Sequence, residues 1–456
     1  MIIDRSSWPC MAVICLTLLV SSVSAEDWTR FRGESAAGFS KKAAPTKWGP
    51  KENVKWSAEL PGAGVSCPII VGDKVVLTCY SGYGLDRREP GEIDDLKRHI
   101  VCVDRNTGKI LWNRTISNES REDRYSGMGV PEHGYASHTP VTDGKAIYAF
   151  LGKSGVYAYD LEGKQLWHTS VGTNSDDRRW GSASSPILYK DLLIVPAICE
   201  SGALIALNKK DGAEVWKQDA GGLRGTWSTP LIVKVDEKRS DLVMGVPYEV
   251  WGLNPSNGKL RWYLPVEGRS FYTSVMEKDG VIYGAIGGRD GGGSFAVKVG
   301  ADDDATKTHR VWEGPDQSSY ASPVVHNDLM FFVSNGMANA IDAKTGERVK
   351  RVRLKAPARS TGDSNDSGDT EAPRRTRRGG GRTSDYSSPV IANDKMYYIK
   401  RNGEMYILST DKELKQIAVN TVTEKTEEFS ATPAISDGQI FIRSNKRLYC
   451  VEESKK

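Results

Sequence analysis

A small residue followed by proline recurs along the chain about every 45 residues, and this period constrains the fold more than any local propensity does. Each copy opens an apolar run, and Ser or Thr usually stands directly before the proline. The copies are Ser66-Cys67-Pro68, His138-Thr139-Pro140, Ser184-Ser185-Pro186, Ser228-Thr229-Pro230, Ala321-Ser322-Pro323, Ser387-Ser388-Pro389 and Ala431-Thr432-Pro433, with Tyr272-Thr273-Ser274 as an eighth copy that lacks the proline. This period is the length of one four-stranded propeller blade.

The pattern inside one period supports this interpretation. Residues 141–167 alternate β-branched and aromatic residues between short turns such as Asp143-Gly144, which is typical of β-hairpins. The period ends in Asp or Asn, then Gly, then Trp. We expect Asp or Asn to accept hydrogen bonds from turn amides, Gly to take a left-handed backbone, and Trp to pack on the neighbouring blade. The predicted blade-docking residues are Asp104, Gly108, Trp112, Asp160, Gly163, Trp167, Asn208, Gly212, Trp216, Asn254, Gly258, Trp262, Asp342 and Gly346.

The two ends of the chain predict how the array closes. The last copy supplies strands at 440–443 and 447–451 but no fourth strand with Trp, whereas residues 53–57 resemble a fourth strand without a blade. Pairing them would hide both sheet edges. We therefore predict an all-β protein with a single eight-bladed β-propeller over residues 53–456, closed by pairing of the N-terminal and C-terminal strands and preceded by a lead segment at 26–52.

The first 25 residues have the pattern of a secretory signal peptide. Arg5 precedes an apolar stretch from Met11 to Val20, and small residues lead up to Ala25, where we expect cleavage. A buried N-terminal helix is the alternative. No segment approaches the roughly 20 apolar residues that a membrane-spanning helix needs. We therefore expect an exported protein, either periplasmic or secreted, without a transmembrane segment.

Five cysteines follow the predicted signal peptide, and none forms a C-x-x-C pair or an adjacent pair. They are Cys67, Cys79, Cys102, Cys199 and Cys450. An odd number without metal-ligand spacing favours buried thiols over a disulfide scaffold. One disulfide among Cys67, Cys79 and Cys102 stays open as an alternative in an oxidising compartment.

The long connections are predicted to lie on one face of the disc. Residues 82–97, 117–133 and 357–385 connect second to third strands or neighbouring blades, and such connections leave an up-and-down blade on the same side. The opposite face, with short turns, is expected to be plain. Residues 357–384 hold Asp and Ser and then Arg and Gly, a composition that predicts a flexible insertion. An Arg/Gly run can bind nucleic acid, but a net charge of +4 does not favour that partner.

Aromatic and cationic residues stand just before several of the small-residue/Pro marks, where each innermost strand begins. The candidate ligand-binding residues are Arg178, Arg179, Trp180, Arg224, Trp227, Arg269, Tyr272, Tyr320 and Tyr386. At the channel mouth they would suit an anionic or flat conjugated ligand, through guanidinium pairing and stacking. The alternative is that the aromatics pack between blades while the arginines are solvated or pair with Asp176 and Asp177.

We find no catalytic motif in the sequence. The six histidines show no metal-ligand spacing, and the glycine-rich segment 287–293 precedes a strand, which excludes a phosphate-binding loop ahead of a helix. We therefore assign no catalytic and no metal-binding residue.

The blade pattern resembles the PQQ-like repeat propellers. The resemblance rests on the strings from Cys102-Val103-Asp104 to Trp112 and from Ala340-Ile341-Asp342 to Glu347, and it covers about residues 53–451. The opening 27–33 is similar to the Trp/Phe-Arg-Gly start of secreted bacterial members. One branch is the quinoprotein dehydrogenases, which bind a quinone cofactor together with Ca²⁺. Many of them also contain two adjacent cysteines, and this chain contains no such pair. The other branch is similar to the propeller lipoprotein of the outer-membrane β-barrel assembly machinery, from which this chain departs by lacking the lipid-anchor cysteine.

These observations predict an exported, non-catalytic binding or scaffolding propeller without a cofactor, acting as a monomer. It would recognise a protein or a small anionic ligand on its loop-rich face. The alternative that the resemblance implies is a quinone (PQQ)-dependent oxidoreductase that uses Ca²⁺ and acts on an alcohol or a sugar.

Overall fold

The computed structural model describes residues 26–118, 120–127, 129–288, 291–357 and 384–454. The predicted signal peptide and almost all of the predicted flexible insertion therefore lie outside the described residues. Within the described ranges, no helix is long and apolar enough to cross a membrane.

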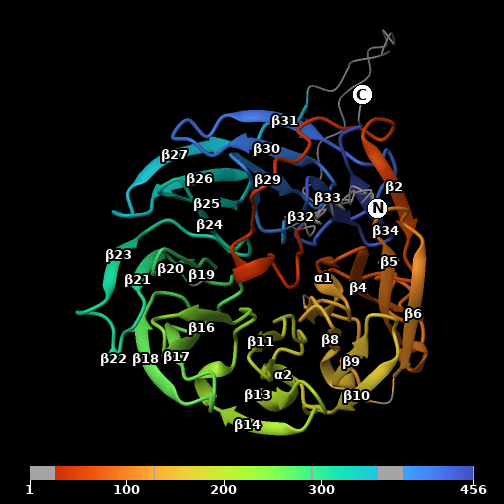
Figure 1. The fold of residues 1–456 in the computed structure, drawn as a ribbon, viewed down its shortest axis with the longest axis horizontal. Coiled ribbons are helices and arrows are strands. Elements are labelled where there is room, and N and C mark those ends of the chain that lie inside the picture. Colours follow the sequence, from red (N-terminus) through yellow and green to blue (C-terminus); the bar gives the residue numbers. More distant parts are fainter. Residues whose placement is uncertain (1–25, 119, 128, 289–290, 358–383, 455–456) are drawn as a thin grey trace, which may run out of the picture.

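Eight antiparallel sheets surround a central axis, which confirms the predicted propeller (Figure 1). Four blades of consecutive strands come first: β3 (Ile69–Val71), β4 (Lys74–Ser81), β5 (Lys97–Asp104) and β6 (Ile110–Ser117) in blade 1; β7 (Val141–Thr142), β8 (Ala146–Phe150), β9 (Val156–Asp160) and β10 (Gln165–Thr169) in blade 2; β11 (Ile187–Tyr189), β12 (Leu192–Ala197), β13 (Ala203–Asn208) and β14 (Glu214–Asp219) in blade 3; β15 (Leu231–Lys234), β16 (Ser240–Val246), β17 (Glu249–Leu253) and β18 (Leu260–Pro265) in blade 4.

The next three blades repeat this order, with the first strand innermost. They contain β19 (Met276–Lys278), β20 (Val281–Ala285), β21 (Ser294–Lys298) and β23 (Arg310–Gly314) in blade 5; β24 (Val324–His326), β25 (Leu329–Ser334), β26 (Met337–Asp342) and β27 (Arg348–Arg353) in blade 6; β28 (Val390–Ala392), β29 (Lys395–Ile399), β30 (Met405–Ser409) and β31 (Gln416–Asn420) in blade 7. Buried side chains of adjacent blades form shared apolar clusters between the sheets.

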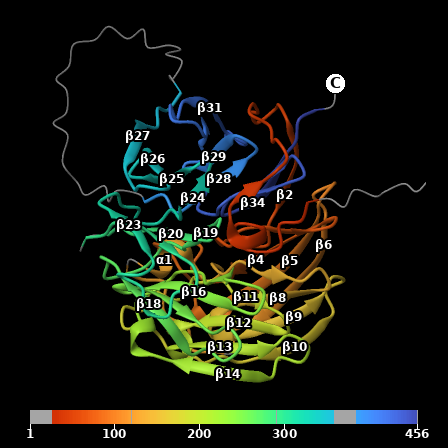
Figure 2. The same cartoon turned by 60° about the vertical axis from the view of Figure 1, so that its left-hand side comes forward.

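Blade 8 closes the ring with strands from both ends of the chain. It combines β32 (Ala434–Ser436), β33 (Gln439–Arg443) and β34 (Arg447–Val451) with β2 (Val54–Glu59) from the N-terminal side. Strand β2 pairs antiparallel with β34, with Ser57 opposite Tyr449, and the two strands lie side by side in Figure 2. The predicted closure is confirmed.

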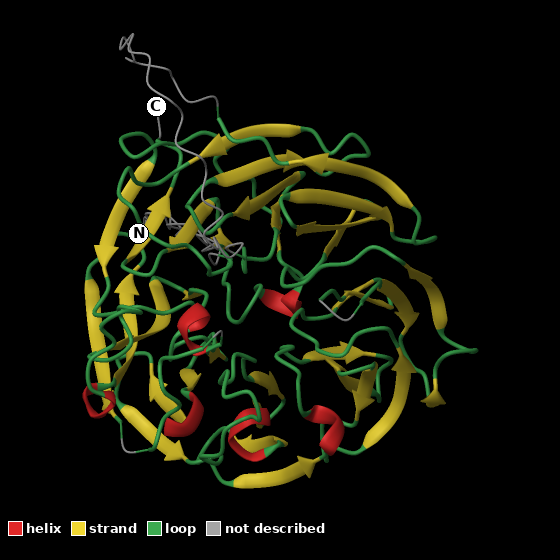
Figure 3. Cartoon of the chain, turned by 180° about the vertical axis from the view of Figure 1, so that it is seen from behind, coloured by secondary structure: helices red, strands yellow, loops and turns green. Residues whose placement is uncertain are grey.

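Helices are short and confined to connections, as Figure 3 shows. They are α1 (Val130–His133), α2 (Ile198–Ser201) and the 3-10 turns η1 (Glu34–Ala36), η2 (Ile93–Asp95), η3 (Gly152–Ser154) and η4 (Gly221–Leu223). Two short strands extend the blades in parallel: β1 (Phe39–Ser40) pairs with the inner strand β28, and β22 (Asp303–Asp304) pairs with the outer strand β18.

The face expected to be plain is covered by the lead segment, which corrects that expectation. Asp27 accepts a hydrogen bond from Gly72 in the β3–β4 turn, and Lys42 pairs with Asp437 in the β32–β33 turn. Both turns belong to the short set, so the lead segment lies on their side of the disc. No periodic pattern predicts this contact, because the lead segment is not part of the repeat.

The recurring Ser or Thr before proline builds a ring of hydrogen bonds around the channel. In each case, the backbone N–H of the last residue of the mark, which precedes proline in every copy except Ser274, donates to the side-chain oxygen of the equivalent residue in the next blade. The donor-to-acceptor pairs are Cys67 to Thr139, Thr139 to Ser185, Ser185 to Thr229, Thr229 to Ser274, Ser274 to Ser322, Ser322 to Ser388 and Ser388 to Thr432, at 2.9 to 3.0 Å. The backbone of Thr432 bonds the Cys67 thiol, so the ring returns to its start. We call these eight residues the hydroxyl ring.

Tryptophans join the outer parts of the blades. The indole N–H of Trp112 donates to the Leu161 carbonyl of the next blade at 3.0 Å, and that of Trp167 donates to the Lys209 carbonyl at 3.0 Å. The Trp112 ring lies on Gly163, which has a φ of +81°, and a Cβ there would come within 2.7 Å of the ring. The turn therefore requires glycine for backbone conformation and for space.

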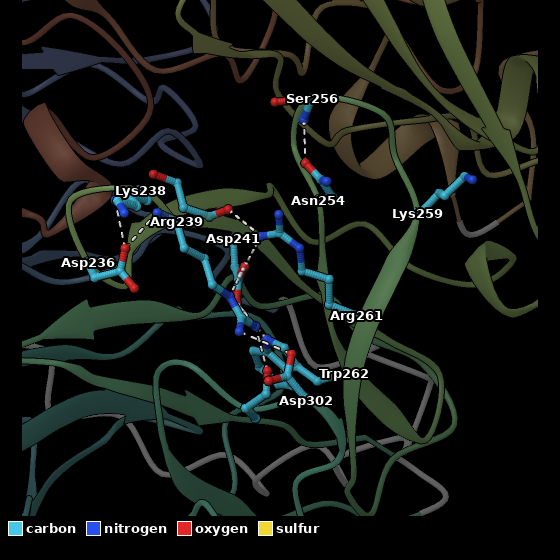
Figure 4. Close-up of polar contacts among 12 residues, drawn as sticks. Asp236, Lys238, Arg239, Asp241, Asn254, Ser256, Lys259, Arg261, Trp262 and Asp302 are labelled. Atoms are coloured by element: carbon cyan, nitrogen blue, oxygen red, sulfur yellow. Dashed lines mark hydrogen bonds and ion pairs between the residues drawn. The ribbon is translucent and has the colours of Figure 1, made fainter.

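Trp262 departs from this arrangement (Figure 4). It is completely buried among side chains of blades 4 and 5, but its indole N–H donates to Asp241 of its own blade at 2.9 Å. Asp241 also accepts hydrogen bonds from Arg239 and Arg261. The buried carboxylate is thus paired with two guanidinium groups, which offsets the cost of its desolvation.

The described cysteines are all buried free thiols. Cys67, Cys79 and Cys102 form no disulfide with one another in this structure. Cys67 instead occupies the one place in the hydroxyl ring where a thiol replaces a hydroxyl.

The hydroxyl ring predicts a stability effect for Thr229→Val. This change keeps the shape but removes the acceptor of the Ser185 N–H, and both residues are buried. Because a buried N–H would lose its partner, we expect the free energy of unfolding to fall by about 1–3 kcal/mol in urea denaturation. Thr426→Val, at an exposed position, is the matched control. Equal stability of the two variants would contradict a structural role of the ring.

Candidate functional site

Five aromatic side chains from successive inter-blade connections form a continuous arc at the channel mouth. The arc consists of Trp180, Trp227, Tyr272, Tyr320 and Tyr386. Ring centroids lie 5.6 Å apart for Trp180 and Trp227 and 5.2 Å apart for Trp227 and Tyr272. The series continues at 5.5 Å from Tyr272 to Tyr320 and 4.7 Å from Tyr320 to Tyr386. All five are half-buried, so each leaves part of its surface to solvent.

The hydroxyl ring explains why these aromatics meet. Trp227, Tyr272, Tyr320 and Tyr386 each stand two positions before a ring residue, so the ring sets their height and spacing. The Trp227 indole N–H also donates to the Gly181 carbonyl at 2.8 Å, which fixes it against the preceding connection. Sequence reasoning identified all five residues as candidates, although it left open whether they pack between blades.

Two cavities adjoin the arc. The larger has a volume of about 1060 Å³ and is lined by Trp180, Tyr272 and Tyr320 together with Arg178 and Arg269. The smaller, of about 520 Å³, is lined by Arg224 and Trp227 and shares Arg178 and Arg269 with the larger. Of the predicted ligand-binding residues, Arg179 and Tyr386 line neither of these two cavities.

The predicted arginines differ in how they are paired. The Arg178 guanidinium lies 4.9 Å from the centre of the Trp180 ring, a cation–π contact. Arg224 lies 3.9 Å from Asp177, and both side chains are strongly exposed, so solvent screens this pair. Arg269 forms no ion pair within the described ranges. The predicted alternative is solvation or pairing with Asp176 and Asp177; Arg224 lies near Asp177, and Arg269 is exposed to solvent.

Three further basic residues line the larger cavity, and the sequence analysis missed them. They are Arg353 at the end of β27, and Lys400 and Arg401 after β29. No repeat signal marks them, because they come from two different blades and precede no proline. Asp385 is the one carboxylate among the described residues that line this cavity, so this described lining carries a net positive charge.

A long connection bridges the channel mouth to blade 7. Glu132 in α1 accepts a hydrogen bond from Arg401 at 2.6 Å and one from the Tyr386 hydroxyl at 3.3 Å. Burial and the nearby Glu132 carboxylate raise the pKa of Tyr386, so its hydroxyl stays protonated and donates. The connection 117–133 thus reaches the end of the aromatic arc on the predicted loop-rich face.

The other side of the mouth is filled by buried ion pairs. Arg98 pairs with Glu122 at 2.7 Å, and Lys153 pairs with Asp123 at 3.2 Å. All four side chains are less than one-tenth exposed. Tyr135 lies in the connection that leads to the ring residue Thr139. It packs here against Tyr80 and does not join the arc. The open arc therefore spans blades 3 to 7 only.

A buried polar chain lies beside these ion pairs. Ser182 donates to Glu200 in α2 at 2.5 Å and contacts His138 Nε2 at 2.9 Å. Burial raises the pKa of Glu200 to about 7 and lowers the pKa of His138 to about 3. Near pH 6, the Glu200 carboxyl is therefore protonated and the His138 imidazole is deprotonated, so both side chains are neutral. Within the described residues, no cluster of three or more His, Cys, Asp or Glu side chains could hold a metal ion.

The raised pKa predicts a pH-dependent effect of Glu200→Gln. Between its usual pKa of 4.5 and about 7, folded Glu200 keeps a proton that the unfolded chain releases. The free energy of unfolding therefore falls as pH rises through this window, by up to about 1.4 kcal/mol per pH unit from this group. His138 acts oppositely between about 3 and 6.5, so the effect is seen in the difference between variant and wild type.

We expect the stability of the variant relative to wild type to increase from pH 4.5 to pH 7 and then to level off. Urea unfolding across this range measures the difference. Glu424→Gln, at an exposed position, controls for the loss of one carboxylate. A pH-independent difference for Glu200→Gln would contradict the assigned protonation.

Comparison with solved structures supports the fold. BamB from Moraxella catarrhalis is 14% identical, with 88% of this chain and 98% of that chain covered and a TM-score of 0.57. A europium-containing methanol dehydrogenase is 11% identical, with 93% and 98% covered and a TM-score of 0.60. Identities this low show a shared fold and not a shared activity. No curated protein matches the chain in sequence.

Comparison with family profiles is more specific. The profile described as outer membrane protein assembly factor BamB matches residues 93–229 and 200–352, which together span more than half of the chain. The matched region runs from blade 1 to blade 6 and includes four of the five arc residues. The chain thus belongs to the PQQ-like repeat propellers of the outer membrane protein assembly factor BamB family.

Proposed function

We propose that the protein is an exported binding propeller that captures a carboxylate-rich segment of a protein partner at its channel mouth. The observation that carries this proposal is that three rings of the aromatic arc and unpaired arginines line one cavity of about 1060 Å³. Export rests on the signal-peptide pattern of residues 1–25. A protein partner accords with the family, whose name describes an assembly factor.

The charge and shape of the cavity support an acidic ligand. Arg178, Arg269 and Arg353 have no carboxylate partner in the described ranges, so their guanidinium groups are available for carboxylates. Arg401 is already held by Glu132 at 2.6 Å and Glu428 at 2.9 Å and serves to fix the wall. The half-buried rings offer flat apolar surface, which suits aromatic or aliphatic side chains between the acidic groups.

The rigidity of the site also favours binding. Its aromatics stand on connections that are tied to the hydroxyl ring, so little side-chain freedom is lost when a ligand arrives. Among the described residues, no group of three or more His, Cys, Asp or Glu side chains is placed to hold a metal ion.

A quinone-dependent oxidoreductase is the second candidate. The specific observation in its favour is that an aromatic arc with arginines would also hold a planar polycarboxylate, and a solved dehydrogenase shares the fold. No group of three or more His, Cys, Asp or Glu residues is brought together in the described part of the chain, so a Ca²⁺ ion there would depend on amide and backbone carbonyl oxygens for most of its ligands. Addition of PQQ and Ca²⁺ followed by melting and dye-reduction measurements separates the two candidates, since a bound ligand raises the melting temperature.

The binding proposal predicts the effect of a double variant, Arg178→Gln with Arg269→Gln. A fluorescein-labelled peptide of alternating Glu and Trp is the probe, and anisotropy measures its affinity. Each guanidinium–carboxylate contact that is lost should weaken binding by about tenfold. Because the site is cationic, added salt should weaken binding of the wild type as well.

Arg351→Gln is the matched control, since Arg351 is exposed on the outer strand β27 and lines neither cavity. The control should bind the peptide like the wild type. Equal affinity of the double variant and the control would remove the channel mouth as the binding site. Competition by citrate at the same site would indicate that small anions bind there in place of a protein segment.

A further inference from the structure

The smaller cavity, of about 520 Å³, differs from the larger one in its charge. Among the described residues that line it, Asp176 and Asp177 stand against the arginines, whereas Asp385 is the one carboxylate in the described lining of the larger cavity. The Asp176 carboxylate also accepts hydrogen bonds from the backbone N–H groups of Trp180 and Gly181, at 2.8 and 3.0 Å. The two negative charges offset most of the positive charge, so the smaller cavity attracts carboxylates less strongly and suits an uncharged group.

One residue of the smaller cavity is an exposed aromatic in an unusual backbone conformation. Tyr248 stands at the second position of the two-residue turn between β16 and β17, with a φ of +68°, where glycine or asparagine is usual. Its side chain is 57% exposed and, within the described part of the chain, stacks on no other ring. Neither packing nor the backbone accounts for a tyrosine here. A contact with a ligand would account for the side chain and for the strain that it adds.

The turn that carries Tyr248 is fixed against its neighbours. The Tyr248 N–H donates to the Gly268 carbonyl at 2.7 Å, and the Tyr248 carbonyl accepts from the Val266 N–H at 2.8 Å, so the turn is tied to the connection between blades 4 and 5. On the other side, a Cβ at Gly225 would lie 3.4 Å from Pro247 Cγ, so the connection between blades 3 and 4 passes close to the turn. The turn therefore forms a fixed wall of the cavity.

The two cavities can receive one continuous segment. Arg178 and Arg269 line both of them, so carboxylates that pair with these arginines lie at the boundary between the cavities. Residues of the segment beyond this boundary would face Trp227, Pro247 and Tyr248. The volume of about 520 Å³ lies within the range of pockets that enclose small ligands, so it accommodates a large side chain.

We propose that the smaller cavity is an anchor site for one aromatic side chain that adjoins the acidic stretch of the partner segment, and that Tyr248 determines this specificity. An aromatic side chain can stack on the free face of Tyr248 while its acidic neighbours pair with Arg178 and Arg269. Aromatic anchors and arginines are typical of the residues that dominate interface affinity. The inference rests on the proposed function, because it places the acidic stretch at the shared arginines.

Three peptides with fluorescein on a central cysteine test the anchor site by anisotropy. The first alternates Glu and Ser, and the other two add a Gly spacer and a Trp at the N-terminal or the C-terminal end, so that both chain directions are tested. With the wild type, one extended peptide should bind about tenfold more tightly than the acidic peptide. Because this gain is apolar, it should persist at high salt, where the binding of all three peptides weakens.

Tyr248→Gly removes the aromatic wall and suits the left-handed backbone, so the variant should fold and melt no lower than the wild type. It should abolish the gain, so that the extended and acidic peptides bind the variant equally. Leu166→Ala is the matched control, because Leu166 is also an exposed apolar side chain, 48% exposed on β10, and lines neither cavity. The control should keep the tenfold gain.

Photo-crosslinking locates the anchor in the wild type without any substitution. The extended peptide with benzoylphenylalanine in place of Trp should label residues 224–227 or 246–249, as detected by mass spectrometry. Labelling confined to the walls of the larger cavity, or a gain in affinity that survives Tyr248→Gly, would overturn the inference.

The outcomes separate the anchor site from the proposed function. If the acidic peptide binds through Arg178 and Arg269 but the added Trp brings no gain, the anchor site is wrong and the proposed function stands. If none of the peptides binds, both are wrong. If only an extended peptide binds and Tyr248→Gly abolishes its binding, the anchor site stands and the requirement for an acidic segment is removed.

Discussion

The hydroxyl ring is the interaction on which the rest of the structure depends. At the start of its innermost strand, each blade offers one backbone N–H and one side-chain oxygen, replaced in blade 1 by the Cys67 sulfur, and the N–H to oxygen bonds around the channel measure 2.9 to 3.0 Å. A proline directly after most ring residues fixes the backbone as it enters the strand. Because the bonds pass from blade to blade, the spacing of the blades is set at the centre. The tryptophans hydrogen-bond the outer parts of neighbouring blades, whose relative positions the central ring already sets.

The channel mouth follows from this central constraint. Residues two positions before the ring residues are held at equal heights, and four of them are aromatic, so they stack from one connection to the next. The mouth is not uniform, because the long connections of blade 1 fill one side with buried ion pairs and tyrosines. The open side, from blade 3 to blade 7, combines flat apolar surface with free guanidinium groups. One half of the mouth is thus filled by paired charges, and the other half presents half-buried rings and unpaired arginines.

Buried charged side chains of this protein have two kinds of hydrogen-bond partner. Arg98, Lys153 and Asp241 are each paired with groups of opposite charge, as expected when desolvation must be offset. Arg32 and Arg443 are buried equally deeply, yet they rely on carbonyl and hydroxyl oxygens and keep unpartnered N–H groups. That difference sets the channel apart from the rest of the interior.

The sequence alone determined the propeller, its blade number and its closure, because a repeat copies one local pattern of strands and turns and each copy adds independent support. It also identified the arc residues, since they precede a repeated mark. Tertiary structure decided which arginines are free, brought Arg353 and Lys400 into the cavity and placed Arg32 of the lead segment against the Pro323 carbonyl. These contacts join residues from different blades or from outside the repeat, and no periodicity records them, because they depend on where the closed ring places side chains in space.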